Sequence, residues 1–112
     1  TKRIYKIFII YNMKQTFYKS TRKNKKYMTN YKGKVIHFGD LNSEHYFDKL
    51  GLYKNLNHND KKRQMNYLNR SAGIKNKGGS LTKDDPYSAN FYSRRFLWGS
   101  KGTPLGIKAV LI

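Results

Sequence analysis

Charge imbalance constrains this chain more than any other feature. Its 112 residues include 24 Lys or Arg but only 6 Asp or Glu, so the formal net charge is +18 at pH 7. With 38% hydrophobic residues, a chain of this length can bury one modest core, and a single domain is expected. A compact domain of this charge repels itself unless a polyanion or an acidic protein neutralises it. The sequence therefore predicts an anionic partner.

Composition also excludes some classes of protein. The chain has no cysteine, which rules out a disulfide framework and a thiolate metal site. Its longest uninterrupted apolar run, Ile7 to Tyr11, is five residues long. Because a membrane-spanning helix needs about 20 apolar residues, no membrane span is expected.

The first forty residues carry strand and turn signals. β-branched and aromatic side chains in residues 2–12 favour a strand, and the basic, polar residues 19–26 predict a loop or arm. Two β-rich runs, residues 26–31 and 34–38, flank a Lys-Gly pair. This pattern predicts a β-hairpin with its turn at Lys32-Gly33 and with Gly33 at positive φ.

A first helix is expected over residues 57–73. Asn57 or Asn59 can cap it, Asp60 sits in its first turn, and Gly73 ends it. Its predicted core-facing stripe is Lys61, Met65, Leu68 and Ala72.

A second helix is expected further along. It starts at Asp84 or Asp85 with Pro86 in its first position, and Gly99 stops it. Its predicted core-facing side chains are Ala89, Phe91, Tyr92, Phe96 and Trp98. Trp98 is expected to be a buried anchor, with Trp98→Ala costing roughly 3 to 5 kcal/mol of stability.

These elements predict a small α+β single domain. A β-hairpin, of two or three antiparallel strands, packs against two helices. The contacts are expected to come from Met65, Leu68, Tyr92, Phe96 and Trp98. Residues 1–24 form an amino-terminal strand and basic arm, residues 25–99 the core domain, and residues 100–112 a carboxy-terminal tail or docking strand.

The histidines and acids are too sparse to predict catalysis. His37, His45 and His58 lie near Asp40, Asp48 and Asp60 in sequence, but two of the six acids, Asp60 and Asp85, are better explained as helix-start residues. Two-metal phosphoryl chemistry needs several converging acids, and no His-x-x-x-His spacing exists. We expect no enzymatic activity, no metal and no cofactor. His37 is interpreted as a strand-face histidine with a local hydrogen bond, and His58 as a helix-start residue.

Glycines and aromatic residues give two further signals. Gly78-Gly79-Ser80 lacks the Gly-Lys-Ser/Thr ending of a phosphate-binding loop and does not follow a predicted strand, so it predicts no nucleotide binding. No small-molecule substrate is expected either. Aromatic side chains make up 15% of the chain. They suit either base stacking in a single-strand binder or a tyrosine-rich core, and the core interpretation is favoured.

Basic clusters are the best functional signal. They fall in the arm, on the outer face of the first helix and in the second helix, with few acids between them. Together they predict phosphate contacts that do not read base sequence. The candidate nucleic-acid-binding residues are Arg22, Lys23, Lys25, Lys26, Lys62, Arg63, Arg70, Arg94 and Arg95.

The order of several short motifs is distinctive. Gly33-Lys34-Val35-Ile36-His37-Phe38-Gly39-Asp40 is followed by His58-Asn59-Asp60-Lys61-Lys62-Arg63, Tyr67-Leu68-Asn69-Arg70, Asp85-Pro86-Tyr87-Ser88-Ala89-Asn90-Phe91-Tyr92-Ser93 and Phe96-Leu97-Trp98. Over about residues 25–98 the chain resembles a family of small basic uncharacterised proteins found in nucleocytoplasmic large DNA viruses. The resemblance implies a viral origin and a place in the virion, with the host cytoplasm or nucleus as the site of assembly. It assigns no catalytic residues.

Two functions remain open at this point. One is a minor capsid or internal virion protein, which docks on other virion proteins through its apolar ends and turns its basic face toward the genome. The other is a free-standing protein that coats or compacts DNA without sequence preference. The resemblance favours the first.

Overall fold

The computed structural model describes residues 14–100 and 108–111. The predicted strand at residues 2–12 lies outside the described residues. In chain order the elements are β1 (Lys14–Lys19), β2 (Lys25–Tyr31), β3 (Lys34–Asp40), the 3-10 helix η1 (Lys54–Leu56), α2 (Lys61–Ser71), the 3-10 helix η2 (Thr82–Asp84), α3 (Ala89–Phe96) and β4 (Lys108–Leu111).

The strands form one four-stranded sheet in the order β3-β2-β1-β4. β2 pairs antiparallel with β1 and with β3, and β4 pairs parallel with β1. The predicted carboxy-terminal strand therefore exists and is paired with this chain's own β1. The expected basic loop at residues 19–26 is wrong at both ends, because β1 continues to Lys19 and β2 already begins at Lys25.

The predicted hairpin is confirmed. Its turn lies at Lys32-Gly33, where φ is 47° for Lys32 and 88° for Gly33. Two consecutive positive φ angles match the twist of the flanking strands, and glycine at the second position adopts its angle without strain. The Asn30 side chain accepts a hydrogen bond from the Gly33 amide at 3.0 Å, which closes the turn.

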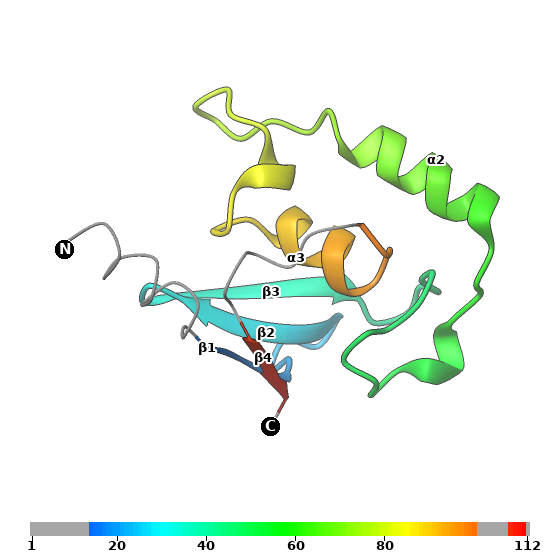
Figure 1. Ribbon diagram of the computed structural model, residues 1–112. Coiled ribbons are helices and arrows are strands. Elements are labelled where there is room, and N and C mark those ends of the chain that lie inside the picture. Colours follow the sequence, from blue (N-terminus) through cyan, green and yellow to red (C-terminus); the bar gives the residue numbers. More distant parts are fainter. Residues whose placement is uncertain (1–13, 101–107, 112) are drawn as a thin grey trace, which may run out of the picture.

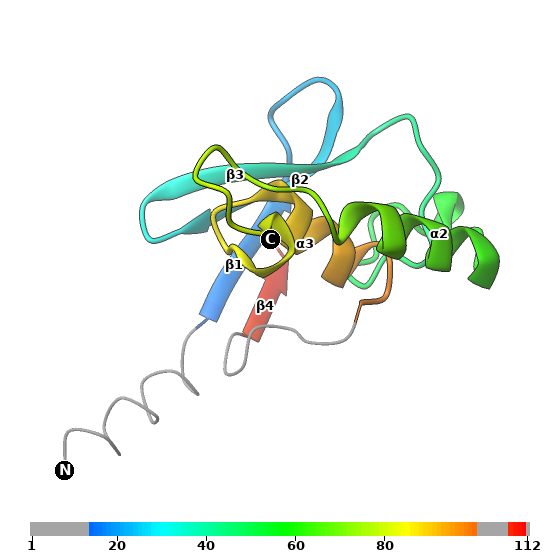
Figure 2. The same ribbon diagram turned by 90° about the horizontal axis from the view of Figure 1, so that it is seen from above.

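The core lies between the sheet and α3. Figure 1 and Figure 2 show α3 over one face of the sheet, whereas α2 lies beyond the end of the sheet, beside α3. The buried hydrophobic residues come from β1, β2, β3, α3 and the residue that follows α3: Phe17, Tyr27, Ile36, Phe38, Phe91, Tyr92, Phe96 and Leu97. The expected α+β domain, with antiparallel strands and two helices, is thus confirmed.

The two buried tyrosines satisfy their hydroxyls inside this core. Tyr27 donates to the Asp48 carboxylate at 2.6 Å, and Tyr92 donates to the Pro86 carbonyl at 2.6 Å. The side-chain amide of Gln15 donates to the Tyr92 oxygen at 2.8 Å. Since buried polar groups must be hydrogen-bonded, these contacts let tyrosine serve as a core residue, as the favoured interpretation of the aromatic content expects.

Helix α2 differs from its prediction in its start and in its packing. Asp60 caps it, because its carboxylate accepts hydrogen bonds from the backbone amides of Lys62 and Arg63. Asn57 and Asn59 are therefore not the cap. Met65, expected in the core, is 60% exposed, since α2 packs beside α3 and not onto the sheet.

Helix α3 begins later than predicted. Its N-cap is Ser88, whose hydroxyl accepts from the Asn90 amide, so Asp84, Asp85 and Pro86 precede the helix. Asp84 ends η2. The predicted stop is confirmed in position, because Gly99 has φ 67° just after the helix.

Trp98 is less buried than predicted. Its side chain is half-buried and packs against the edge of the core, and it is not among the fully buried residues. The residue before it, Leu97, is 1% exposed and fills the core position. Leu97 approaches the sheet closely at Gly39, where a Cβ would lie 2.7 Å from a Leu97 methyl carbon. Glycine is needed at position 39 for that approach and for its φ of 80°.

Candidate nucleic-acid interface

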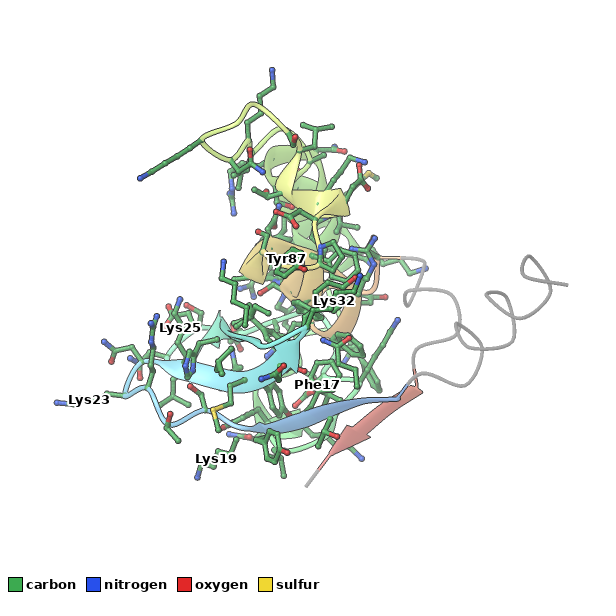
Figure 3. All side chains as sticks on the ribbon, turned by 90° about the vertical axis from the view of Figure 1, so that its left-hand side faces the viewer. Phe17, Lys19, Lys23, Lys25, Lys32 and Tyr87 are labelled. Atoms are coloured by element: carbon green, nitrogen blue, oxygen red, sulfur yellow. The ribbon has the colours of Figure 1, made fainter. Side chains whose placement is uncertain are left out.

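The turn between β1 and β2 is one exposed basic surface. Arg22 and Lys23 are exposed in the turn, and Lys25 is half-buried at the start of β2. Figure 3 shows Lys19, Lys23 and Lys25 around this turn, apart from Lys32 and Tyr87. The predicted arm residues are thus brought together, although on a tight turn between strands and not on a free arm.

The outer face of α2 is a second basic surface, and all three of its predicted residues are exposed. Arg63 pairs with Glu44 at 3.0 Å. The guanidinium carbon of Arg70 lies 5.8 Å from the centroid of the Tyr67 ring, within reach of a cation-π contact. Lys62 does not line the cleft described below, and no ion pair involves it among the described residues.

Lys26 was predicted to bind nucleic acid, and the structure contradicts this. It is 1% exposed, and its ammonium donates to the carbonyls of Asp40 (2.6 Å) and Ser43 (2.7 Å). Burial lowers the pKa of Lys26, against the opposing effects of Asp40 and Asp48. A side chain enclosed in this way ties the end of β3 to the following turn and is not a surface phosphate contact.

Arg94 and Arg95 are also engaged within the fold. Arg94 is 9% exposed and donates to the Leu68 carbonyl (2.7 Å) and the Ser71 hydroxyl (2.6 Å). It therefore fastens α3 to the carboxyl end of α2, where a cation also interacts well with the helix dipole. Arg95 donates to the carbonyls of Lys83 and Phe91, and its guanidinium lies 3.7 Å from the Phe91 ring centroid.

A cleft of about 720 Å³ is lined by one residue of the first basic surface and by two residues of the second. It lies between the first residues of β2, the end of β3, α2 and both ends of α3. Lys25, Arg63 and Arg70, far apart in the sequence, all line it. Its lining residues are Lys25, Lys26, Gly39, Asp40, Ser43, Glu44, His45, Arg63, Asn66, Tyr67, Arg70, Ala89, Asn90, Ser93, Leu97 and Trp98.

An aromatic stack forms part of the cleft wall. The rings of Tyr67 and Trp98 are parallel to within 8°, with centroids 4.1 Å apart. The His58 ring lies 5.2 Å from the Trp98 ring, and the Gln64 amide donates to the Trp98 carbonyl at 3.1 Å. Tyr67 lines the cleft but was not among the residues predicted for the site. The signal was present, because Arg63, Tyr67 and Arg70 are spaced by four and three residues and so share one face of a helix.

The histidines lie in three separate settings. His37 Nδ1 is 2.8 Å from the Ser20 hydroxyl, as the strand-face interpretation expects. His58 Nδ1 accepts from the Asp60 amide at 2.9 Å just before α2. His45 is 1% exposed, and its Nε2 donates to the Asn57 side-chain oxygen at 2.6 Å. Burial is the main cause that lowers the pKa of all three imidazoles.

The acids near these histidines have structural partners. Asp48 is 1% exposed and accepts hydrogen bonds from the Tyr27 hydroxyl and from the amides of Leu50 and Tyr53. Asp40 accepts from Ser43 and from the Asn42 amide, and these bonds lower the pKa of its carboxyl. Within residues 14–100 and 108–111, no three His, Asp or Glu side chains gather closely enough to hold a metal ion.

No helix in the described part of the chain has the length and apolar content needed to cross a membrane. A model of the DUF5754 family, a family of unknown function, matches residues 15–71. That match spans β1, β2, β3 and α2, and it includes Lys25, Arg63, Tyr67 and Arg70 of the cleft. No curated protein and no solved structure matches the chain. Because the family model covers half of the chain, the protein belongs to the DUF5754 family.

Proposed function

We propose that the protein is a non-enzymatic architectural protein that binds nucleic acid through phosphate contacts. The observation that carries this proposal is the separation of its cations into two groups. Lys26, Arg94 and Arg95 donate hydrogen bonds within the fold. The other predicted cations remain accessible: Arg22, Lys23 and Lys62 are exposed at the surface, and Lys25, Arg63 and Arg70 line one cleft. The second group is positioned for an external anion.

Few acids are available to neutralise the exposed group. Among the described residues, ion pairs link only Arg63 to Glu44 and Lys83 to Asp84. The net charge of +18 therefore generates a strong positive field, which favours a polyanion. Lysine and arginine at such a surface contact phosphates and leave the base sequence unread.

The resemblance to proteins of large DNA viruses extends the proposal to a place in the particle. We propose a minor capsid or internal virion component, with its basic face toward the genome and with other virion proteins as neighbours. The alternative is a free-standing protein that compacts DNA. A protein census of purified particles, with neighbours crosslinked, separates them: the virion role requires the protein in the particle and crosslinked to structural proteins, and its absence there favours the alternative.

The phosphate-binding part is tested by titrating the protein with two duplexes of unrelated sequence at several salt concentrations. If about six phosphates are neutralised, log affinity falls against log salt with a slope of roughly −5, equally for both duplexes. Absence of binding at low salt, or an affinity indifferent to salt, would reject nucleic acid as the anion. An acidic protein surface would then be the partner.

A further inference from the structure

We propose that the cleft holds one unpaired nucleotide, with its phosphate at the arginine rim and its base along the Tyr67–Trp98 wall. This inference rests on the proposed function and makes it more specific. The protein would prefer single-stranded nucleic acid, or a free nucleotide, over an intact duplex at this site.

The shape of the cleft favours an unpaired nucleotide. Its volume of about 720 Å³ falls within the range of small-ligand pockets, roughly 300 to 1,000 Å³. Proteins read a duplex by inserting a convex helix or strand ribbon into a groove, and a hollow of this size cannot enclose a paired base. A nucleotide splayed out of a single strand fits a concave site.

The rim supplies the phosphate partners. Arg63 and Arg70 lie two turns apart on one face of α2, and Lys25 faces them from the start of β2. Arg63 forms an ion pair with Glu44, but no carboxylate pairs with Arg70 in the described part of the chain. Arg70 is thus the guanidinium with donors available for a bidentate phosphate contact.

The cleft lining also contains a buried cation that no carboxylate pairs with. The Lys26 ammonium has three donors, and only two carbonyls accept from it in the structure. The nearby Asp40 carboxylate is engaged by Ser43, and the Asp48 carboxylate by Tyr27, Leu50 and Tyr53. Because a buried charge without a counter-charge is costly, an anion in the adjacent cleft would stabilise this arrangement.

The Tyr67–Trp98 stack in the cleft lining offers apolar contact to a base. Tyr67 and Trp98 present a rigid aromatic surface that is held by their mutual stacking and by the Gln64 hydrogen bond to the Trp98 carbonyl. Asn66, one residue before Tyr67 on α2, also lines the cleft and carries an amide that can both donate to and accept from a base edge. Apolar contact together with one amide accommodates any base and specifies none.

Trp98 provides a direct test, because it is the only tryptophan in the chain. Its fluorescence is followed while the full chain is titrated with oligothymidylate, thymidine monophosphate, a blunt duplex and inorganic polyphosphate. The proposal predicts that oligothymidylate changes Trp98 emission saturably, whereas duplex and polyphosphate bind with little change. A response to thymidine monophosphate at similar concentration would identify the free nucleotide as sufficient, and a response to oligothymidylate alone would identify the strand.

Three single variants locate the effect. Arg70→Ala and Asn66→Ala each weaken the Trp98 response to oligothymidylate by roughly tenfold, as expected for loss of a good polar contact. Lys61→Ala, on the same helix but outside the cleft and outside the predicted binding residues, leaves that response within about twofold. All three sites are exposed, so the fold is retained.

The outcomes distinguish this inference from the proposed function. Salt-dependent binding of duplex and single strand with equal affinity and unchanged Trp98 emission would overturn the cleft site and leave phosphate binding intact. Equal losses in Arg70→Ala and Lys61→Ala would likewise overturn it, since charge alone would then explain binding. Absence of binding to every nucleic acid would overturn both.

Discussion

The two helices differ in what they bury. α3 buries Phe91, Tyr92 and Phe96 against the sheet, whereas α2 buries only Ser71 completely. Both helices show an apolar stripe in the sequence, yet no residue of the α2 stripe is fully buried and Met65 is 60% exposed. α2 is held by its cap, by the Tyr67–Trp98 stack and by Arg94. A helix attached mainly at one side can present its cations while the sheet and α3 carry the stability.

The same contrast separates the basic residues. Arg94 and Lys26 are oriented inward and donate to carbonyls, whereas Arg63 and Arg70 lie at the rim of the cleft. Lysine and arginine in one sequence cluster can thus have opposite roles. What decides the role is the element that carries the residue and the face of that element which is covered.

The largest expected effect comes from breaking the core. Phe38 is fully buried, with ring centroids of Phe17, Tyr27 and Tyr92 within 6.0 Å. Phe38→Ala should lower the free energy of unfolding by roughly 3 to 5 kcal/mol, because it leaves a cavity among these rings. Met65→Ala, on the exposed stripe of α2, is the matched truncation and should cost less than about 0.5 kcal/mol in urea unfolding. Equal losses would show that α2 is as much a core element as α3.

A second pair of variants compares an inward with an outward arginine. Arg94→Ala should destabilise by roughly 2 to 3 kcal/mol, because the Leu68 carbonyl and the Ser71 hydroxyl lose a charged donor. Arg70→Ala should leave urea unfolding almost unchanged and weaken DNA binding. If Arg94→Ala is as stable as the wild type and binds DNA less well, the assignment of Arg94 to the fold is wrong.

The hairpin turn gives a smaller effect. A Cβ on Gly33 meets no atom within 4 Å, so the cost of Gly33→Val is confined to the backbone at φ 88°. A loss of about 1 to 2 kcal/mol is expected. Gly73→Ala is the control, since that position is equally open and has no positive φ. It should not lose stability.

The smallest effect is a pH dependence centred on His45. Burial lowers the pKa of His45 in the folded state, so below about pH 6.5 the unfolded chain binds a proton that the folded chain does not. The contribution of neutral His45 to the free energy of unfolding is therefore fully present above about pH 6.5, and it is lost as the pH falls through the folded pKa. His45→Gln keeps an amide donor for Asn57, and it should show a smaller loss of stability between about pH 7.5 and about pH 5. An unchanged pH profile would exclude His45 as the source.

The sequence predicted local features better than tertiary ones. The Lys32-Gly33 turn follows from chemistry within a few residues, and the hairpin was placed to within one or two residues. The start of α2 was displaced because Asn57 was expected as a cap, whereas its side chain is engaged by His45 and by the Asp48 amide. These partners lie in the irregular segment before η1, and no local pattern reveals them.

The exposed part of the candidate site was predicted from the sequence, whereas the buried part was not, because burial depends on tertiary contacts. Exposed cations on α2 and in the β1–β2 turn follow from periodicity and polarity. The burial of Lys26 depends on Asp40 and Ser43, which reach it only after β3 pairs with β2. The partner of Arg94 is the end of another helix. Such pairings depend on topology, so composition alone assigned these residues to the surface.

The most direct test of the account is the salt dependence of DNA binding in two charge-reversal variants. Lys62→Glu, Arg63→Glu and Arg70→Glu are combined in one protein, and Lys49→Glu, Lys54→Glu and Lys75→Glu, at exposed positions outside the cleft, are combined in the other. Both changes alter the net charge equally. We expect the first variant to flatten the slope of log affinity against log salt by about 3, since each lost phosphate contact removes about 0.9, and the second to change it by less than about 1. Equal slopes in the two variants would contradict the proposed binding surface, because binding would then depend on net charge and not on the cations of α2.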